Sequence, residues 1–454
     1  MKKWWLILTL VLTLCACAAS AEISGDWEYF PLEDGTVEIY DYSGLAEELV
    51  IPTEIDGSKV SRLGDTCFAE LPTLRRVTIP DGITQIGRNP FFSCPALEEI
   101  VVSIDHPTLA TIDGVLFYKP EKKLVSYPIT RLDMTYAVPE GILAIGGDAF
   151  FDSNLTEIIL PSTLTTLEDM AFRSCGVLDI VILPESVQYV GAYAFNSCAA
   201  LTFVNLPEGL EAIYEGTFVG CMSLTSIDIP ESVLSIGEYA FSGCQGIAEF
   251  DLPANLAALG HGAFAQCHAM KRIVLPDSLK LGYGNPFIGC SGLTDIVVSM
   301  DHPTLATIDG VLFRKSDKTL VCYPSGLTAS AYTVPEGIQV IGKAAFQDNF
   351  KLEEITLPST LKEIGMEAFS YCRLIRKIVI PDGVTKIGLW AFLWAQQLAE
   401  ATVPASVTEI GQDAFNADYC PITLHTWRGS YAAQWAKENG LAYDYADALD
   451  WLTN

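Results

Sequence analysis

Five histidines are the side chains in this 454-residue chain best suited to acid–base chemistry. His106 and His302 each stand inside an Asp-His-Pro tripeptide, His261 and His268 lie seven residues apart, and His425 lies near the C-terminus. We interpret His261 and His268 as surface residues. None has a nucleophile at motif spacing, and the chain lacks Gly-x-Ser-x-Gly, P-loop and Gly-x-Gly-x-x-Gly stretches. The sequence therefore predicts no catalytic residues and no cofactor.

Carboxylates are abundant but do not define a site. The chain has 56 Asp and Glu against 27 Lys and Arg, a net charge of −29. This balance argues against nucleic-acid binding, which needs a basic surface, and against attraction to anionic lipid. Choosing two carboxylates as a glycosidase pair would be arbitrary. Asp105, Asp113, Asp301 and Asp309 can contribute to a calcium site, but we interpret them as hairpin residues and predict no metal.

A repeat of about 23 residues positions all of these groups. A typical copy has Phe as an anchor, then Leu at +6, Ile or Val at +9 and +11 and Pro at +12, and ten of the thirteen anchors have a Gly four residues before them. Such a period marks a solenoid, in which each coil stacks on the next. The anchors are Phe68, Phe91, Phe150, Phe172, Phe195, Phe218, Phe241, Phe264, Phe287, Phe346, Phe369, Phe392 and Phe415.

The coil that begins at Phe218 shows the local pattern. Residues 224–229 alternate between apolar and polar side chains, which predicts a short half-buried strand. Pro230 ends it, because Pro cannot donate a ladder hydrogen bond. Gly237, four residues before the next anchor, suggests a tight bend or a positive φ.

These repeats resemble the BspA-like leucine-rich repeats of bacterial surface proteins, whose motif is roughly Leu-x-x-Ile-x-Ile-Pro-x-x-Val-x-x-Ile-Gly-x-x-Ala-Phe. The resemblance covers residues 44 to 415. It implies a β-rich, right-handed solenoid with a parallel sheet on one face. It also implies a secreted or surface-attached binding role without enzymatic activity.

Eight cysteines stand three residues after an anchor, six of them in consecutive coils. Adjacent coils would hold them about 4.8 Å apart with parallel Cβ atoms, wider than a disulfide usually spans. Ser153, Asn349, Ala395 and Asp418 fill the same slot elsewhere. We therefore predict a buried column of free thiols rather than disulfides or a zinc site.

The N-terminal residues 1–21 have the features of a signal peptide: Lys2 and Lys3, an apolar core, and Ala-Ser-Ala at 19–21. The alternative is a lipoprotein signal that leaves Cys17 lipidated. Either reading predicts an extracellular or cell-surface protein, and no later apolar run reaches membrane length. Residues 22–43 predict a β-hairpin cap, with Trp27 packed inside it.

The solenoid is predicted to run over residues 44–420, with inserts near 100–136 and 296–332. The two inserts have nearly the same amino-acid sequence and lie 196 residues apart. Both contain Asp-His-Pro-Thr-Leu-Ala-Thr-Ile-Asp-Gly-Val-Leu-Phe. Asp-Gly between strand-like runs predicts a β-hairpin in each insert. Residues 421–454 form the expected C-terminal cap. Ser430 is a candidate N-cap of a helix that Gly440 ends, and the residues after it have no predicted element.

The candidate binding residues are the outward strand positions, at +8 and +10, which vary from coil to coil. Ile159, Ile180, Ile182 and Phe203 form an apolar group, and Asp228 and Asp251 belong to an acidic group beside it, with Ser226 and Glu249. Contiguous exposed apolar surface edged by charge is typical of interaction sites. Trp390 and Trp394, on either side of an anchor, are a second candidate, for sugar stacking or a protein contact.

The leading hypothesis is a monomeric, non-enzymatic adhesion or recognition protein whose sheet face binds a protein on a host or neighbouring cell. The alternatives are a carbohydrate-binding protein that uses Trp390 and Trp394, and a structural spacer without a specific ligand.

Overall fold

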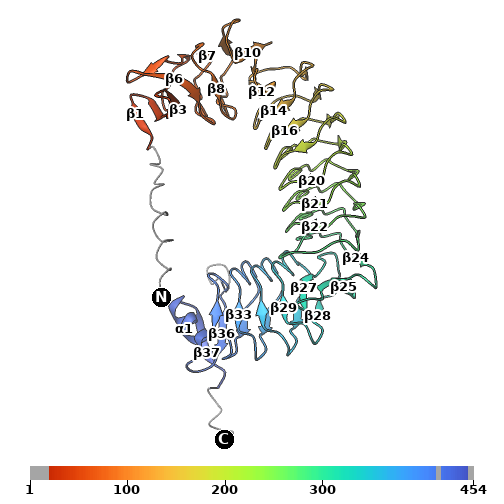
Figure 1. Ribbon diagram of the computed structural model, residues 1–454. Helices are drawn as coiled ribbons and strands as arrows, with labels where there is room; N and C mark the ends of the chain where they lie inside the picture. Colours follow the sequence, from red (N-terminus) through yellow and green to blue (C-terminus); the bar gives the residue numbers. More distant parts are fainter. Residues whose placement is uncertain (1–19, 416–420, 448–454) are drawn as a thin grey trace, which may run out of the picture. The chain divides into compact units, whose positions relative to one another are not determined.

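The computed structural model describes residues 20–415 and 421–447. The chain folds into two compact units, Met1–Arg131 and Leu132–Asn454. Both consist of short strands linked by turns, with one helix in the described part of the chain (Figure 1).

The first unit contains the following strands: β1 (Glu22–Ser24), β2 (Trp27–Pro31), β3 (Val37–Tyr42), β4 (Glu48–Val50), β5 (Glu54–Ile55), β6 (Ser58–Leu63), β7 (Arg76–Ile79), β8 (Gln85–Ile86), β9 (Glu99–Val102), β10 (Leu109–Ile112), β11 (Val115–Tyr118) and β12 (Lys123–Ser126).

The second unit contains these elements: β13 (Thr135–Ala137), β14 (Ala144–Ile145), β15 (Glu157–Ile159), β16 (Thr166–Leu167), β17 (Ile180–Val181), β18 (Tyr189–Val190), β19 (Phe203–Val204), β20 (Ala212–Ile213), β21 (Ser235–Ile236), β22 (Ala258–Leu259), β23 (Arg272–Leu275), β24 (Asp295–Val298), β25 (Leu305–Ile308), β26 (Val311–Arg314), β27 (Thr319–Cys322), β28 (Ala331–Thr333), β29 (Val340–Ile341), β30 (Glu354–Thr356), β31 (Glu363–Ile364), β32 (Lys377–Val379), β33 (Lys386–Ile387), β34 (Glu400–Thr402), β35 (Glu409–Ile410), β36 (Thr423–Thr426), α1 (Tyr431–Glu438) and β37 (Ala442–Tyr445).

The first unit begins with an antiparallel sheet, β1–β2–β3, whose last strand pairs in parallel with β6. The predicted N-terminal hairpin is β2 and β3, and β1 adds a strand that the sequence did not predict. The Trp27 ring lies 4.5 Å from Tyr42 and 6.3 Å, edge-on, from the anchor Phe68. These antiparallel strands therefore cover the first ring of the core.

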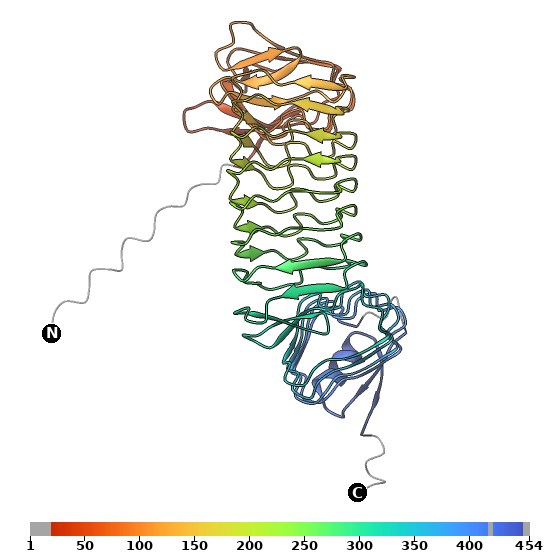
Figure 2. The ribbon, with the colours of Figure 1, turned by 90° about the vertical axis from the view of Figure 1, so that its right-hand side faces the viewer.

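The second unit is a parallel solenoid. One set of strands, β13–β15–β17–β19, β23–β24, β28–β30 and β32–β34–β36, lies at the predicted positions. A second set lies further along each coil and includes β14–β16–β18, β20–β21–β22 and β29–β31–β33–β35. The sequence predicted only the first set, because strands of two residues leave almost no alternating pattern. Figure 2 shows the yellow and green coils stacked one upon another.

Stacked phenylalanine rings fill the core. Phe172, Phe195, Phe218 and Phe241 have successive ring centroids 5.4 Å apart with interplanar angles of 2°, 3° and 9°. All four are buried. A ring of the same kind at the same place in every coil thus fixes the register of neighbouring coils.

Two anchors are tyrosines that the sequence count missed. Tyr323 lies twelve residues before Pro335, is buried, and stacks on Phe346 with 5.2 Å between the ring centroids. Tyr127 holds the same place relative to Pro139 and is also buried. Each insert is therefore a single coil of 36 residues, from Phe91 to Tyr127 and from Phe287 to the second tyrosine.

Where a glycine stands four residues before an anchor, a neighbouring coil approaches it closely and its φ is not positive, which rules out one of the two alternatives that the sequence offered. A Cβ on Gly191 would lie 2.5 Å from the Asp169 nitrogen of the preceding coil, and one on Gly388 would lie 2.4 Å from the Met366 nitrogen. The residues with positive φ instead lie two positions before and after the anchor, as at Tyr193 (57°) and Ser197 (60°).

The inserts carry the hairpins that Asp-Gly suggests. β10 pairs antiparallel with β11, and β25 with β26, each through a two-residue loop. Asp113 and Gly114 have φ values of 51° and 78°, and Asp309 and Gly310 have 51° and 80°, as a type I′ turn requires. A third antiparallel strand, β12 or β27, follows in each copy.

The chain's last described coil is covered by α1, which confirms the predicted helical cap. The Ser430 hydroxyl accepts a hydrogen bond from the Ala433 nitrogen at 3.2 Å, as an N-cap does. The Trp435 ring lies 6.2 Å, edge-on, from the anchor Phe415. After the helix the structure has a further strand, β37, parallel to β36, where the sequence predicted none. Among the described residues, no helix is long and apolar enough to cross a membrane.

Candidate binding face

The outward positions of the first strand set contain the predicted apolar group. Ile159 and Ile182 are 53% and 56% exposed, and Ile180 and Phe203 are each 43% exposed. Ile180 pairs directly with Phe203 across β17 and β19. We call these four side chains the apolar patch.

The strand alternation explains why these residues face outward. Their neighbours Ile158, Val181 and Val204 are buried in the core, so successive residues on β15, β17 and β19 point to opposite faces. Burial of the inward residues fixes the register, because a shift of one residue would bury the outward set instead. The apolar patch is therefore held on a rigid surface.

The next two coils continue this face with negative charge. Asp228, Glu249 and Asp251 are exposed, and we call them the acidic patch. The strand predicted over residues 224–229 is absent, and none forms over residues 247–253. Asp228 and Asp251 occupy the same position of neighbouring coils, and like charges directly opposite each other destabilise strand pairing. We infer that this repulsion contributes to the gap between β19 and β23.

The two tryptophans lie at the ends of one turn, with the buried anchor Phe392 between them. Both have positive φ, 55° at Trp390 and 57° at Trp394. Trp390 is 37% exposed. The Trp394 ring stacks on Tyr371 of the preceding coil, with 6.0 Å between centroids and 13° between planes. One face of Trp394 is thus covered by protein, while Trp390 presents more surface to solvent.

The cysteine slot is part of the core. The ten cysteines of the described residues are free and buried. The thiol of Cys221 donates to the Phe195 carbonyl at 3.2 Å, and that of Cys244 donates to the Phe218 carbonyl at 3.2 Å. Burial raises the pKa of Cys221 to about 12. These thiols therefore tie each coil to the preceding one and stay protonated.

The interpretation of His261 as a surface residue is wrong, while His268 is exposed as expected. His261 is 4% exposed, and its Nδ1 has no hydrogen-bond partner among the described residues. Gly284 of the next coil lies against the imidazole, because a Cβ on Gly284 would lie 2.6 Å from the Nδ1 of His261. Burial, then the charge of Lys343, lowers its pKa to about 4.

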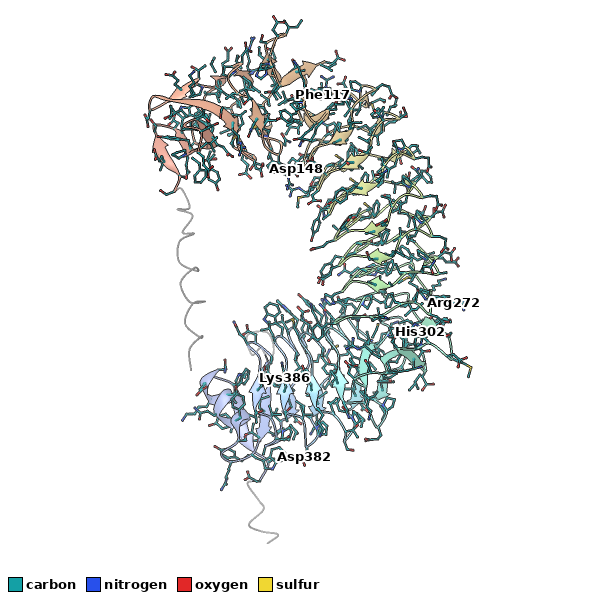
Figure 3. All side chains as sticks on the ribbon, viewed as in Figure 1. Phe117, Asp148, Arg272, His302, Asp382 and Lys386 are labelled. Atoms are coloured by element: carbon teal, nitrogen blue, oxygen red, sulfur yellow. The ribbon has the colours of Figure 1, made fainter. Side chains whose placement is uncertain are left out.

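His106 and His302 are also buried, which the sequence did not indicate. Figure 3 labels His302 beside the strands of the second insert. His425 is the histidine closest to carboxylates, with its Nδ1 2.6 Å from Asp444 and its Nε2 3.8 Å from Glu400. It lies on β36, and no nucleophile is recorded in contact with it.

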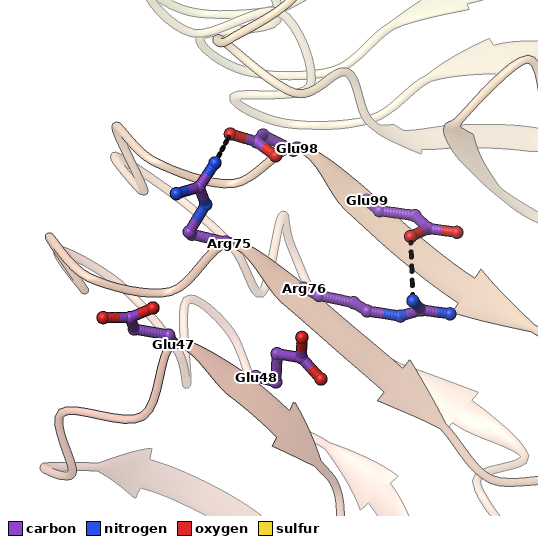
Figure 4. A pocket seen from close by; sticks show the side chains of 6 residues that line it. All are labelled: Glu47, Glu48, Arg75, Arg76, Glu98 and Glu99. Carbon is purple, nitrogen blue, oxygen red and sulfur yellow. Dashed lines mark hydrogen bonds and ion pairs between the residues drawn. The ribbon is translucent and has the colours of Figure 1, made fainter.

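A shallow pocket of about 590 Å³ lies over β4, β7 and β9 in the first unit (Figure 4). Arg75 pairs with Glu98 at 2.6 Å and Arg76 with Glu99 at 3.4 Å. The other lining residues are Glu47 and Glu48. The pocket is thus lined entirely by charged side chains, four of which pair with one another.

No group of three or more metal-ligating side chains was found within residues 20–415 and 421–447. Asp113 and Asp309 serve in the hairpin turns described above. The alternatives for the leader, including lipidation of Cys17, lie almost wholly outside the described residues, as does the end of the predicted C-terminal cap.

The repeats match a known family model. The model, described as a BspA type leucine rich repeat region (6 copies), matches residues 39–131, 133–227, 211–332 and 325–430. No curated protein matches the chain significantly.

Solved structures with similar repeats come from several bacteria. A leucine rich cell surface protein from Faecalibacterium prausnitzii is 25% identical, covers 94% of this chain and 98% of its own, and has a TM-score of 0.45. A leucine-rich repeat protein from Bacteroides ovatus is 21% identical, with 93% and 99% covered and a TM-score of 0.37. The pneumococcal vaccine antigen PcpA is 18% identical, with 94% and 98% covered and a TM-score of 0.37.

Proposed function

Because the chain belongs to the BspA-type leucine-rich repeat family, we propose that it is a non-enzymatic protein of the bacterial surface that binds other proteins through its sheet face. The signal-like residues 1–21 support export. The apolar patch is the observation that carries the binding role. The partner is a protein on a host or neighbouring cell, bound by a monomer of this chain.

The apolar patch has the size and composition of a contact centre. Full burial of a large apolar side chain is worth about 1.5–3 kcal/mol, so covering four half-exposed ones contributes roughly 3–6 kcal/mol. Phe203 is the aromatic anchor, since hot spots concentrate in buried aromatic side chains at the centre of an interface. The surrounding charges would form its polar rim.

The test is the double variant Ile180→Asp/Phe203→Asp, assayed for capture of purified extracellular-matrix proteins. Both substitutions lie at outward positions, so we expect an unchanged circular dichroism spectrum and loss of saturable capture. The matched control is Val274→Asp/Val379→Asp, which adds the same charge at outward positions of β23 and β32, where the side chains are 50% and 54% exposed. Undiminished capture by the first variant would rule out the apolar patch.

Carbohydrate binding is the second candidate, favoured by the exposed indole of Trp390. Sugar rings stack on an open aromatic face, and Trp390 offers more of one than Trp394. The variant Trp390→Ala, compared with the wild type on a glycan array, tests it. Absence of signal from the wild type would set this candidate aside. A structural spacer without a ligand is the remaining alternative, and a saturable protein partner would count against it.

A further inference from the structure

After Arg173, the coils that carry most of the binding face have no basic residues. Between Arg173 and Lys271 the sequence contains ten Asp and Glu and no Lys or Arg. The apolar patch lies partly within this stretch, and the acidic patch wholly within it. The electrostatic potential over this part of the sheet face is therefore negative.

At two other places on the same face, a carboxylate is paired with a basic side chain of this chain. Arg272 pairs with Asp295 at 3.0 Å, and Lys377 pairs with Glu400 at 2.9 Å, in both cases across neighbouring coils. Arg272, labelled in Figure 3, stands at the border of the acidic stretch. Asp228, Glu249 and Asp251 have no ion-pair partner among the described residues.

The two patches follow one another along the solenoid. Phe203 occupies the +8 position of one coil, and Glu249 occupies the same position two coils later. With about 4.8 Å between neighbouring strands, the two side chains emerge roughly 10 Å apart. The acidic patch, whose charges have no partner in the described part of the chain, thus follows the apolar patch along the solenoid axis.

We infer that the partner's docking segment carries apolar side chains followed, roughly 10 Å further along, by Lys or Arg. This inference rests on the proposed function, because the apolar side chains must enter the apolar patch. The basic side chains would then lie over the acidic patch and supply the counter-charge that the chain itself lacks there. Such complementarity favours the correct orientation and raises the association rate.

The experiment selects peptides from a random 15-residue phage library on the purified full chain, with counter-selection on Ile180→Asp/Phe203→Asp. We expect the enriched peptides to combine large apolar residues with a net positive charge. Their affinity should fall at least tenfold between 50 and 500 mM NaCl, because salt screens exposed charges.

The charge reversal Asp228→Lys/Asp251→Lys provides the second readout. It should weaken binding of a synthetic copy of the best peptide at least tenfold, and a copy with Glu in place of its Lys and Arg should recover part of the loss. The control is Asp81→Lys/Asp382→Lys, which changes the net charge equally at exposed turn residues outside the acidic stretch. We expect this control to bind like the wild type.

The outcomes separate the two proposals. Enriched peptides that need Ile180 and Phe203 but carry no positive charge, or that bind the charge reversal unchanged, would overturn the inference and leave the proposed function standing. Peptides that bind without the apolar patch, or no enrichment at all, would overturn both.

Discussion

His106 and His302 each hold the backbone of their insert together. The Nε2 of His302 donates to the Pro276 carbonyl at 3.1 Å, and its Nδ1 accepts from the Thr304 and Leu305 nitrogens at 3.2 and 3.1 Å. His106 makes the equivalent three contacts, with the Pro80 carbonyl and the Thr108 and Leu109 nitrogens. This pattern requires the neutral ring with its proton on Nε2, so these imidazoles serve structure.

His261 makes stability depend on pH. Its pKa is lowered to about 4 in the folded chain, from an unfolded value of about 6.5. The unfolded chain therefore binds more protons between these pH values, and stability falls as pH falls through that window. We expect the wild type to lose on the order of 2–3 kcal/mol more than His261→Phe between pH 6.5 and 4, measured by urea unfolding. Parallel pH profiles of the two proteins would contradict this.

The thiol column predicts slow chemical labelling. Because the thiolate is the reactive form and burial raises the pKa of Cys221 and Cys290 to about 12, these two thiols should resist maleimide at pH 7.5 in the native protein. Labelling should become complete in 6 M guanidinium chloride. Mass spectrometry of the labelled peptides distinguishes these cysteines from Cys420, which lies outside the described residues. Rapid native labelling at Cys221 would show that its coil opens readily.

The residue scale also shows where sequence reasoning ends. The phenylalanine anchors and the cysteine slot follow from spacing, because each recurs at one place in the period. The reason for Gly191 does not, since its Cβ would collide with a coil 22 residues earlier in the chain. Tyr127 and Tyr323 were missed as anchors because they are not phenylalanines and stand 36 residues after the preceding anchor, although each lies 23 residues before the next one.

At the scale of elements, the gap in the first strand set has a testable cause. Replacing both charges by Asp228→Asn/Asp251→Asn removes the repulsion between neighbouring coils at nearly constant shape. We expect a stabilisation of about 0.5–1 kcal/mol and slower amide exchange over residues 225–229 and 248–252, measured by mass spectrometry. The control Asp81→Asn/Asp382→Asn, in turns outside this gap, should change neither. Faster exchange in the first variant would point to another cause for the gap.

The hairpins could be predicted and the second strand set could not. Asp-Gly between apolar runs identifies a two-residue turn from four or five neighbouring residues. Strands such as β20 or β21 are two residues long and exist only through pairing with the next coil. The sequence of two residues does not indicate which coil they pair with, so these strands can be identified only in the folded structure.

At the scale of the whole array, stability is shared between neighbouring coils. Phe218 contacts Phe195 on one side and Phe241 on the other. Phe218→Ala should therefore cost about 3–5 kcal/mol and raise amide exchange first in the coils on either side. Hydrogen exchange followed by mass spectrometry tests this, with the surface substitution Ser226→Ala as control. Uniform exchange changes throughout Leu132–Asn454 would instead indicate a fully cooperative unit.

The solenoid and its helical cap follow from the sequence because the core positions are repeated thirteen times or more. The binding face is different, because Ile182 and Asp228 occupy the same position of their coils and differ in both size and charge, which a period does not specify. Their exposure could be predicted from strand alternation. The identity of the partner cannot be deduced from the repeat period or from the fold, because it depends on the surface of a second molecule.

Because of the ring stack, the gene can gain or lose whole repeats without disrupting the core. From Phe150 to Phe287 and from Tyr323 to Phe415, each anchor ring stacks on the equivalent ring of the next coil. Unequal recombination between two such repeats that removes or adds one whole period therefore rejoins compatible surfaces. The same event with a partial period would place a polar turn residue in the anchor position. We therefore expect related proteins to differ in length by whole coils. Each gained or lost coil also changes the outward residues that the protein presents.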